Sequence, residues 1–261
     1  MRVEVKEIEI SPEDLEKIKE IQLEILIELD RICREHGIKY NICAGTLLGA
    51  VRHKGFIPWD DDIDVFMPDT DYYKFVEKFM EDDRYKLQIV DDTNDVWGHY
   101  RFSRVILKGT LLVENDFYYR HYTGVNIEIL PIVGLPSVEE ERVAYMRKYD
   151  AMNKLRTKIF YDSDGNMDIF RKKCGEQMEK LTPAMFDESD YVGVLGTGYF
   201  EKDCTRRAVY EETLRLPFED IMVNVPAGYK EYLDNLYGEG WEKIPPKSKQ
   251  TWKHNIEAYW L

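Results

Sequence analysis

The clearest hydrophobic pattern in the chain predicts a long helix near its start. Ser11 and Pro12 signal a helix start, because serine caps free N–H groups and proline fits the first helical turn. Gly37 is a typical residue to follow the last turn. Apolar residues at helical spacing lie between these signals: Leu15, Ile18, Ile21, Ile25, Leu29 and Ile32.

Shorter elements are predicted along the rest of the chain. Apolar runs bounded by turn residues predict strands at 40–43, 63–66, 85–90, 100–106, 110–114, 125–130, 191–195, 208–210 and 221–225. Helical spacing predicts further helices at 46–52, 71–80, 137–160, 168–181 and 229–237. Pro131 is expected to end its strand, because proline cannot donate to a sheet ladder. We expect a single α/β (α+β) domain over residues 1–261, with a largely helical insertion at about 137–210.

The composition is that of a globular protein with an acidic surface. The 261 residues carry 36 Lys and Arg against 50 Asp and Glu, a formal net charge of −14, and 44% are hydrophobic. A chain of this length buries a core without disulfide or metal staples. An acidic surface repels a phosphate backbone, so general nucleic-acid binding is excluded and an anionic ligand needs a local basic patch.

The sequence indicates neither a disulfide framework nor a membrane span. The cysteines are Cys33, Cys43, Cys174 and Cys204. Their separations predict free thiols in a reducing compartment. The first residues lack the apolar core of a signal peptide, and the longest stretch without Asp, Glu, Lys or Arg, 40–51, is too short to cross a bilayer. We therefore expect a cytoplasmic protein.

The densest candidate chemistry is an acidic run that leads into a strand. Side chains alternate across an extended segment, so Asp60, Asp62 and Asp64 are expected on one face, about 6.6 Å apart at Cα. Carboxylates this close disfavour one another's ionisation unless a cation neutralises them. Such oxygen ligands favour Mg²⁺ or Mn²⁺, which are often shared with substrate phosphates.

Two other interpretations fit this acidic run less well. An EF-hand also has carboxylates at this spacing, but it requires glycine where the chain has Val65 and a glutamate where it has Asp71. The second is a solvated acidic turn before a strand, which the flanking sequence disfavours. A metal site is therefore the prediction.

Residues upstream of the acidic run are suited to phosphate. Gly45 allows close approach of the backbone, and the Thr46 hydroxyl and the N–H groups of the next helical turn can bind phosphate oxygens. A basic trio follows: Arg52, His53 and Lys54. These side chains either neutralise diphosphate oxygens or cap the helix and remain solvated.

The stretch 45–65 closely resembles the LicD family of the nucleotidyltransferase-fold superfamily. In that superfamily a Gly-Ser-like pair precedes an acid-hydrophobic-acid-hydrophobic strand, which corresponds here to Gly45, Thr46, Asp62 and Asp64. The strand's two hydrophobic positions are Ile63 and Val65.

The resemblance continues outside this motif. Glu128 stands where the family usually has an Asp as third carboxylate, and Arg104 where it often has Lys. The segments 102–110 and 217–238 are also similar to the family. Residues 137–210 carry almost no resemblance, so we expect substrate choice to depend on them.

The resemblance implies a nucleotidyltransferase-like mixed sheet flanked by helices and a Mg²⁺- or Mn²⁺-dependent transferase. Such an enzyme moves a phosphorylated small alcohol, usually phosphocholine, from a cytidine diphosphate (CDP)-linked donor to a hydroxyl acceptor. The implied acceptor is a cell-surface glycan or a glycolipid precursor. The implied location is the cytoplasm, including the inner face of the membrane.

Residue roles follow from this implied reaction. The catalytic carboxylates are Asp62, Asp64 and Glu128. The metal ligands are Asp60, Asp62, Asp64 and Glu128. The substrate-binding residues are Gly45, Thr46, Arg52, His53, Lys54 and Arg104. Glu128 either completes the metal site or accepts the proton of the acceptor hydroxyl.

Two other functions remain open at this point. A nucleotidylyltransferase of the same fold would transfer a nucleoside monophosphate to a small phosphorylated substrate and release pyrophosphate. A binding module without catalysis is disfavoured, because the carboxylates are intact.

Some residues outside the motif keep more than one interpretation. Asp61 is expected to cap a turn or helix. His254 either folds back over the site or is structural or solvated. A choline-like group would need an aromatic cage, for which the candidates are Tyr100, Tyr118, Tyr119 and Tyr122.

Overall fold

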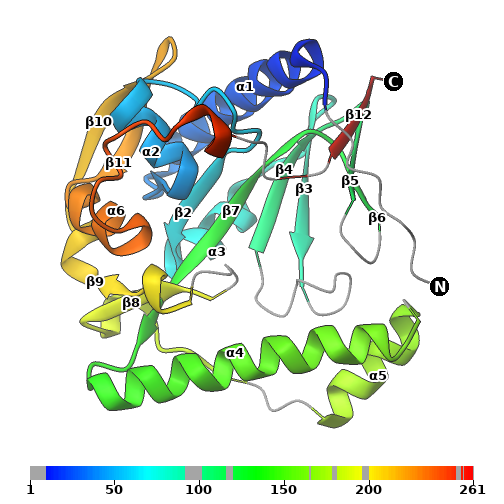
Figure 1. The fold of residues 1–261 in the computed structure, drawn as a ribbon, viewed down its shortest axis with the longest axis vertical. Coiled ribbons are helices and arrows are strands. Elements are labelled where there is room, and N and C mark those ends of the chain that lie inside the picture. Colours follow the sequence, from blue (N-terminus) through cyan, green and yellow to red (C-terminus); the bar gives the residue numbers. More distant parts are fainter. Residues whose placement is uncertain are drawn as a thin grey trace.

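The computed structural model of the protein combines helices with a mixed sheet (Figure 1). It describes residues 10–91, 102–115, 120–164, 166–177, 181–195, 200–250, 254 and 256–260. The helices are α1 (Pro12–His36), α2 (Ala44–His53), α3 (Asp69–Lys78), α4 (Glu139–Tyr161), α5 (Met167–Gln177) and α6 (Tyr229–Tyr237). The strands up to the middle of the chain are β1 (Asn41–Ile42), β2 (Asp64–Pro68), β3 (Tyr85–Val90), β4 (Phe102–Leu107), β5 (Thr110–Asn115), β6 (Arg120–Thr123) and β7 (Asn126–Leu135). The later strands are β8 (Tyr191–Val194), β9 (Thr205–Arg206), β10 (Thr213–Phe218), β11 (Ile221–Pro226) and β12 (Ile256–Trp260).

The main sheet has the strand order β1-β2-β7-β4-β3, and β7 also pairs with β8, which pairs with β9. The β2 and β7 strands run parallel, whereas the other pairs in this sheet are antiparallel. Separate smaller sheets consist of the β10–β11 hairpin and of the strand order β12-β5-β6. The prediction of a mixed α/β fold is therefore confirmed.

Helices cover both faces of the main sheet. On one face, α1 and α3 pack on β7, and Tyr72 of α3 shares a 2.7 Å hydrogen bond with Ser103 of β4. On the other face, Tyr232 of α6 packs edge-on against Phe66 of β2. Because side chains alternate along a strand, Asp64 lies on the same face as Phe66, at the start of β2.

The long strand β7 differs from the prediction, because it continues through Pro131 to Leu135. Pairing with β4 ends at Ile129, and pairing with β8 begins at Ile132. Pro131 therefore lies between two partner strands along that edge of β7, where its missing N–H breaks no ladder. The expectation that Pro131 ends the strand is wrong for this reason.

Other differences concern short segments. The predicted strand at 208–210 is instead part of a 3-10 helix, Arg207–Tyr210. The β10 and β12 strands were not predicted; Pro217 interrupts the apolar pattern of β10. Within residues 137–210, the α4 and α5 helices are followed by β8 and β9, which join the main sheet.

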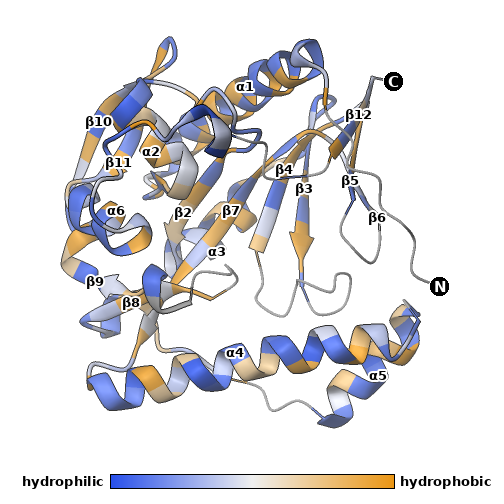
Figure 2. Ribbon diagram, in the orientation of Figure 1, coloured by the Kyte–Doolittle hydropathy of each residue, from blue (hydrophilic) through white to orange (hydrophobic). Residues whose placement is uncertain are grey.

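The α4 helix runs along one border of the molecule, and α5 folds back beside its C-terminal end (Figure 1). Phe160 of α4 and Phe170 of α5 stack edge-on with ring centroids 5.7 Å apart. Apolar residues concentrate on the central strands, whereas polar residues occupy much of α4 (Figure 2). Among the described helices, none is both long and apolar enough to cross a membrane.

Candidate active site

Acidic side chains from distant parts of the chain meet in one cavity of about 230 Å³. Its ionisable lining consists of Asp61, Asp62, Asp64, Glu114, Glu128 and His254. We call this the acidic cavity. Because Asp64, Glu114 and Glu128 come from β2, β5 and β7, the cavity lies where the main sheet meets the smaller β12-β5-β6 sheet.

Strand register brings the key side chains into one row. Asp64 of β2 is the parallel register partner of Glu128 on β7, and Glu128 is the antiparallel partner of Arg104 on β4. Side chains at paired positions share a face of a sheet. Two carboxylates and one guanidinium therefore lie side by side across three neighbouring strands.

Arg104 is buried and contacts Glu128 directly. Its Nε and Nη2 atoms lie 2.9 and 2.8 Å from the same Glu128 oxygen, Oε1. Its Nη1 atom lies 2.6 Å from Nε2 of His121. This guanidinium therefore fixes the direction of the Glu128 carboxylate.

The N-terminus of α2 forms another wall of the acidic cavity through Ala44 and Gly45. Ala44 has a left-handed backbone conformation (φ 44°), which is uncommon for a residue with a Cβ, and its N–H donates to the Tyr232 hydroxyl at 3.3 Å. Gly45 is required for space, since a Cβ there would lie 2.5 Å from Oδ2 of Asp60. Asp60 is therefore packed against the first turn of α2, and it is not among the residues that line the cavity.

Thr46 connects α2 to the acidic strand. Its buried hydroxyl oxygen accepts a 2.9 Å hydrogen bond from the N–H of Asp64. The side chain predicted to bind phosphate thus holds the backbone from which the Asp64 carboxylate projects.

The acidic cavity is electrostatically strained without a cation. Burial raises the pKa of Asp64 well above its usual value, and the neighbouring Asp62 and Glu128 carboxylates raise it further. His254 opposes this shift with its positive charge. Several carboxylates that disfavour one another's ionisation are an arrangement that suits a bound cation.

His254 lies over the acidic run. Its Nδ1 is 2.8 Å from Oδ1 of Asp61 and 3.7 Å from Oδ2 of Asp62. The hydrogen bond to Asp61 raises the pKa of His254 to about 10, although burial acts in the opposite direction. Of the two interpretations of His254, the structure therefore supports the one in which it folds back over the site.

Two buried oxygen atoms in the cavity wall have no hydrogen-bond partner among the described residues. They are Oε1 of Gln22 and Oδ2 of Asp61. The Gln22 amide group donates to the carbonyl oxygens of Asp61 and Asn126 at 3.0 and 3.2 Å, which holds the side chain in place. Unpaired buried oxygens are costly, so a ligand or cation that contacts them would relieve this cost.

Comparison with known proteins places this site in a family. Residues 37–163 match the family model described as LicD/FKTN/FKRP, nucleotidyltransferase domain. The chain is 28% identical to lipopolysaccharide cholinephosphotransferase LicD of Haemophilus influenzae, over 92% of this chain and 95% of that protein. These matches support membership of the LicD family.

A shorter similarity extends to mammalian proteins. Ribitol 5-phosphate transferase FKRP of Mus musculus and that of Homo sapiens are each 32% identical over 97 residues. The match covers 29% of this chain and 20% of either relative. It therefore concerns only a part of those larger proteins.

The basic trio predicted to bind substrate lies outside the cavity lining. Arg52, near the opposite end of α2, donates to the carbonyl oxygens of Trp241 and Lys243 at 2.8 and 3.3 Å. His53 packs edge-on against Trp59, and Lys54 is exposed with a left-handed backbone that ends α2. The structure thus gathers Gly45, Asp62, Asp64 and Glu128 of the predicted site, with Thr46 and Arg104 directly behind them.

Sequence reasoning did not assign ligand roles to Asp61, Glu114 or Gln22. The side chains of the acidic run were expected to alternate between two faces from Asp60 onward. The strand begins only at Asp64, so the side chains before it do not follow this alternation. Gln22 is a polar residue within the apolar face of α1, which is a signal that could have indicated its inward position.

The tyrosines proposed as an aromatic cage give no site in the described residues. Tyr122 lies on β6 and is 60% exposed. Tyr100, Tyr118 and Tyr119 lie outside the residues that the structure describes.

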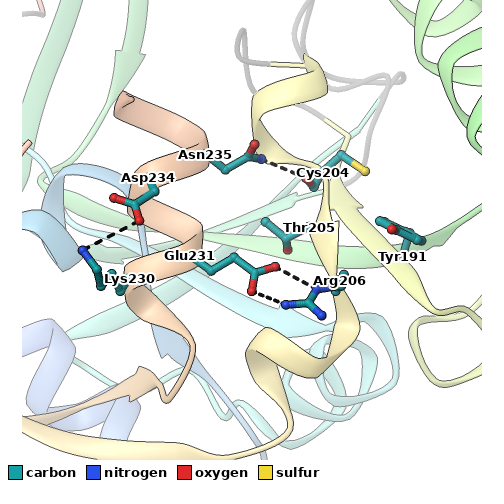
Figure 3. A pocket seen from close by; sticks show the side chains of 8 residues that line it. All are labelled: Tyr191, Cys204, Thr205, Arg206, Lys230, Glu231, Asp234 and Asn235. Carbon is teal, nitrogen blue, oxygen red and sulfur yellow. Dashed lines mark hydrogen bonds and ion pairs between the residues drawn. The ribbon is translucent and has the colours of Figure 1, made fainter. Parts of the chain in front are cut away.

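A second, open pocket of about 710 Å³ lies between α6 and β9 (Figure 3). Its cations are paired with acids, since Arg206 contacts Glu231 at 2.5 Å and Lys230 contacts Asp234 at 3.8 Å. Asn235 donates to the carbonyl oxygen of Cys204 at 2.9 Å. These pairs leave the pocket close to neutral, so the acidic cavity remains the better candidate for metal-assisted chemistry.

Proposed function

We propose that the protein is a divalent-metal-dependent transferase of the LicD family that moves a phosphorylated small alcohol, such as phosphocholine, to a hydroxyl acceptor. The proposed donor is CDP-linked, and the proposed acceptor is a cell-surface glycan or its glycolipid precursor. The observation that carries this proposal is the register pairing of Asp64 with Glu128, which places both carboxylates in a cavity with Asp62.

The relatives support the class of reaction. The protein from Haemophilus influenzae is a cholinephosphotransferase, and the mammalian relatives are ribitol 5-phosphate transferases. Both names describe transfer of a phosphorylated alcohol. The first similarity covers nearly the whole of both chains, so it supports the proposal beyond the segment that the family model matches.

The donor groups fit a hard divalent cation. Asp62, Asp64 and Glu128 offer carboxylate oxygens, which Mg²⁺ and Mn²⁺ prefer. Burial raises the pKa of Asp64, and the neighbouring carboxylates raise it further; a divalent cation would relieve this crowding of negative charge. We therefore assign Asp62, Asp64 and Glu128 as ligands, with Mg²⁺ or Mn²⁺ neutralising phosphate charge when bound. Asp60 packs against Gly45 and supports the phosphate-binding turn in this proposal.

The protein's own groups would position the phosphates. The first turn of α2 carries N–H groups that lack intrahelical partners, and an anion binds well at such a helix end. Gly45 allows close approach, and Thr46 keeps Asp64 in place. Arg104 holds Glu128 beside Asp64, which preorganises the charges before substrate binds.

The proposal is tested by incubating the protein with Mg²⁺ and CDP-choline or CDP-ribitol, together with a glycan acceptor. We expect release of CMP that depends on the divalent ion. Pyrophosphate release from a nucleoside triphosphate, without CMP release from either donor, would instead support the nucleotidylyltransferase.

Substitutions test the carboxylates in the same assay. Asp64→Asn should lower turnover by about 100- to 1,000-fold, because it removes charge that stabilises the transition state. Asp83→Asn is the matched control, since Asp83 is exposed and lies outside the cavity lining. Equal turnover of the two variants would contradict the proposed site.

A further inference from the structure

We infer that Asp61, Asp62 and His254 form a second cation site, which binds a divalent transition-metal ion such as Zn²⁺. The ligand atoms of these three residues lie within 4.8 Å of one another. They come from two segments, the acidic run and the segment just before β12, so a bound ion would join parts of the chain that are 193 positions apart.

The distances suit a compact coordination sphere. A tetrahedral ion with ligands at about 2.0–2.1 Å places neighbouring ligand atoms about 3.3 Å apart. The Nδ1 atom of His254 lies 2.8 Å from Asp61 Oδ1 and 3.7 Å from Asp62 Oδ2, which are distances on either side of that value. Nδ1 of His254 must give up its proton to bind the ion, which then takes the place of that proton between His254 and the carboxylates. Small side-chain movements then let the three atoms share one ion.

Orphaned oxygen atoms give independent support for a ligand here. The Asp61 side chain is only 1% exposed, and its Oδ2 atom has no hydrogen-bond partner among the described residues. Oε1 of Gln22 is also buried without a hydrogen-bond partner among the described residues, and Gln22 lines the same cavity. The hydrogen bond between His254 and Asp61 involves only Oδ1 of the carboxylate. The buried Oδ2 atom is therefore left for another ligand.

The ligand types select the class of metal. Imidazole nitrogen is a common ligand of Zn²⁺, Co²⁺ and other transition metals, whereas Mg²⁺ prefers oxygen ligands alone. His254 is 48% exposed at its side chain, so the site is open to an ion from solvent. The site proposed for the reaction, with Asp64 and Glu128, offers only oxygen.

Register holds His254 in place for this role. Ile256, two positions further along, is buried and pairs with Glu114 on β5. The strand pairing therefore fixes the segment that carries His254 above the acidic run. An ion at this position would fasten β12 to the acidic run and close one side of the acidic cavity.

This inference rests on the proposed function in one respect, because Asp62 is a ligand both of the proposed Mg²⁺ site and of the second cation site. It does not depend on which group the enzyme transfers, and its test therefore uses metal binding instead of turnover. Saturating Mg²⁺ is present throughout, so that the oxygen-only site is filled.

The test is a titration with Co²⁺, whose visible absorption reports its ligands, followed by calorimetry with Zn²⁺. The wild-type protein should bind one ion per chain, without the charge-transfer absorption that a cysteine thiolate would give. His254→Ala should weaken binding by about 100-fold, at least as much as removal of a group that only orients a ligand. His36→Ala is the matched control, because His36 lies at the end of α1, about 21 Å along the helix from Gln22.

Two further variants complete the design. Asp61→Asn should weaken Co²⁺ binding in the same way, and circular dichroism confirms that each variant is folded. Asp64→Asn should lose turnover and keep its Co²⁺ affinity. The inference is overturned if wild-type protein binds no Co²⁺, if His254→Ala and Asp61→Asn bind it unchanged, or if Asp64→Asn alone abolishes binding.

Discussion

Arg104 and Glu128 are register partners on β4 and β7, and two nitrogen atoms of the Arg104 guanidinium contact one oxygen of Glu128. The contact leaves the second carboxylate oxygen available to the acidic cavity. Arg104 is 5% exposed, whereas the side chain of Glu128 is 30% exposed. The arginine thus acts from behind the carboxylate, as a positioning residue.

The first prediction concerns Arg104. Arg104→Met should weaken the activating effect of Mg²⁺ by about 10- to 100-fold, the usual cost of losing a group that orients a metal ligand. Arg104→Lys keeps the positive charge but has a single donor group, so its response to Mg²⁺ should lie between those of the wild type and Arg104→Met. Steady-state kinetics at several Mg²⁺ concentrations separates the roles. A higher KM for the donor at unchanged Mg²⁺ dependence would show that Arg104 contacts the donor.

The second prediction concerns Glu128 itself. Glu128→Gln removes the charge with little change in size, and it should weaken Mg²⁺ binding because a neutral amide is a poorer ligand. Glu128→Asp keeps the charge on a side chain one methylene shorter and should retain more affinity. Calorimetric Mg²⁺ titration of the three proteins measures this order. Unchanged Mg²⁺ affinity together with a lost kcat would assign Glu128 to proton transfer.

A third prediction uses two glycines. Gly45→Ala should destabilise the protein by about 1–3 kcal/mol, because its Cβ would collide with Asp60 in a packed site. Gly175→Ala is the control, since nothing beyond the neighbouring α5 backbone lies within 4 Å of the Cβ position and alanine favours the α5 helix by about 0.5–1 kcal/mol. Urea unfolding of both variants measures the two effects. Equal stability would mean that Asp60 does not pack on the turn of α2.

The fourth prediction concerns pH and the buried carboxylate of Asp30. Arg215 and Tyr40 each form a 2.6 Å hydrogen bond with its Oδ1 atom. Burial would raise the pKa of Asp30, but these hydrogen bonds outweigh it, so the pKa lies below its usual 3.8. Because the pKa is lower in the folded than in the unfolded protein, this carboxylate stabilises the fold above pH about 4. That stabilisation disappears as the pH falls through the folded-state value.

Asp30→Asn tests this relationship. At pH 7 the variant should be less stable by about 1–3 kcal/mol, since the paired charge is lost and buried partners remain. The difference from the wild type should shrink as the pH falls below 3.8 and through the lowered pKa of Asp30 in the folded protein. Denaturant unfolding across this pH range measures it, and a difference that is constant with pH would contradict the role of the ionised carboxylate.

Much of the fold could be predicted because its signals are local. The bounds of α1 were correct, since Ser11 caps the helix and Gly37 ends it with a left-handed conformation. The bounds of α6 and β3 were also correct. Pro131 misled the prediction of β7, because the effect of a proline depends on which neighbouring strand pairs at that position, and local sequence signals do not specify that pairing.

The family resemblance identified individual residues of the candidate site, including the distant Arg104 and Glu128, but not the contacts between them. Gly45, Thr46, Asp62 and Asp64 lie within one motif that the family resemblance identifies. The roles of Arg104 and Gln22 depend on contacts with residues 24 and 39 positions away, respectively, which only strand register and helix packing establish. His254 is the extreme case, because its partner Asp61 lies 193 positions earlier.

That separation has a consequence for biosynthesis. A nascent chain that has emerged only as far as β11 already contains Asp61, Asp62, Asp64 and Glu128, but it lacks the wall formed by His254 and Ile256. The acidic cavity therefore acquires its last wall only when β12 has been synthesised.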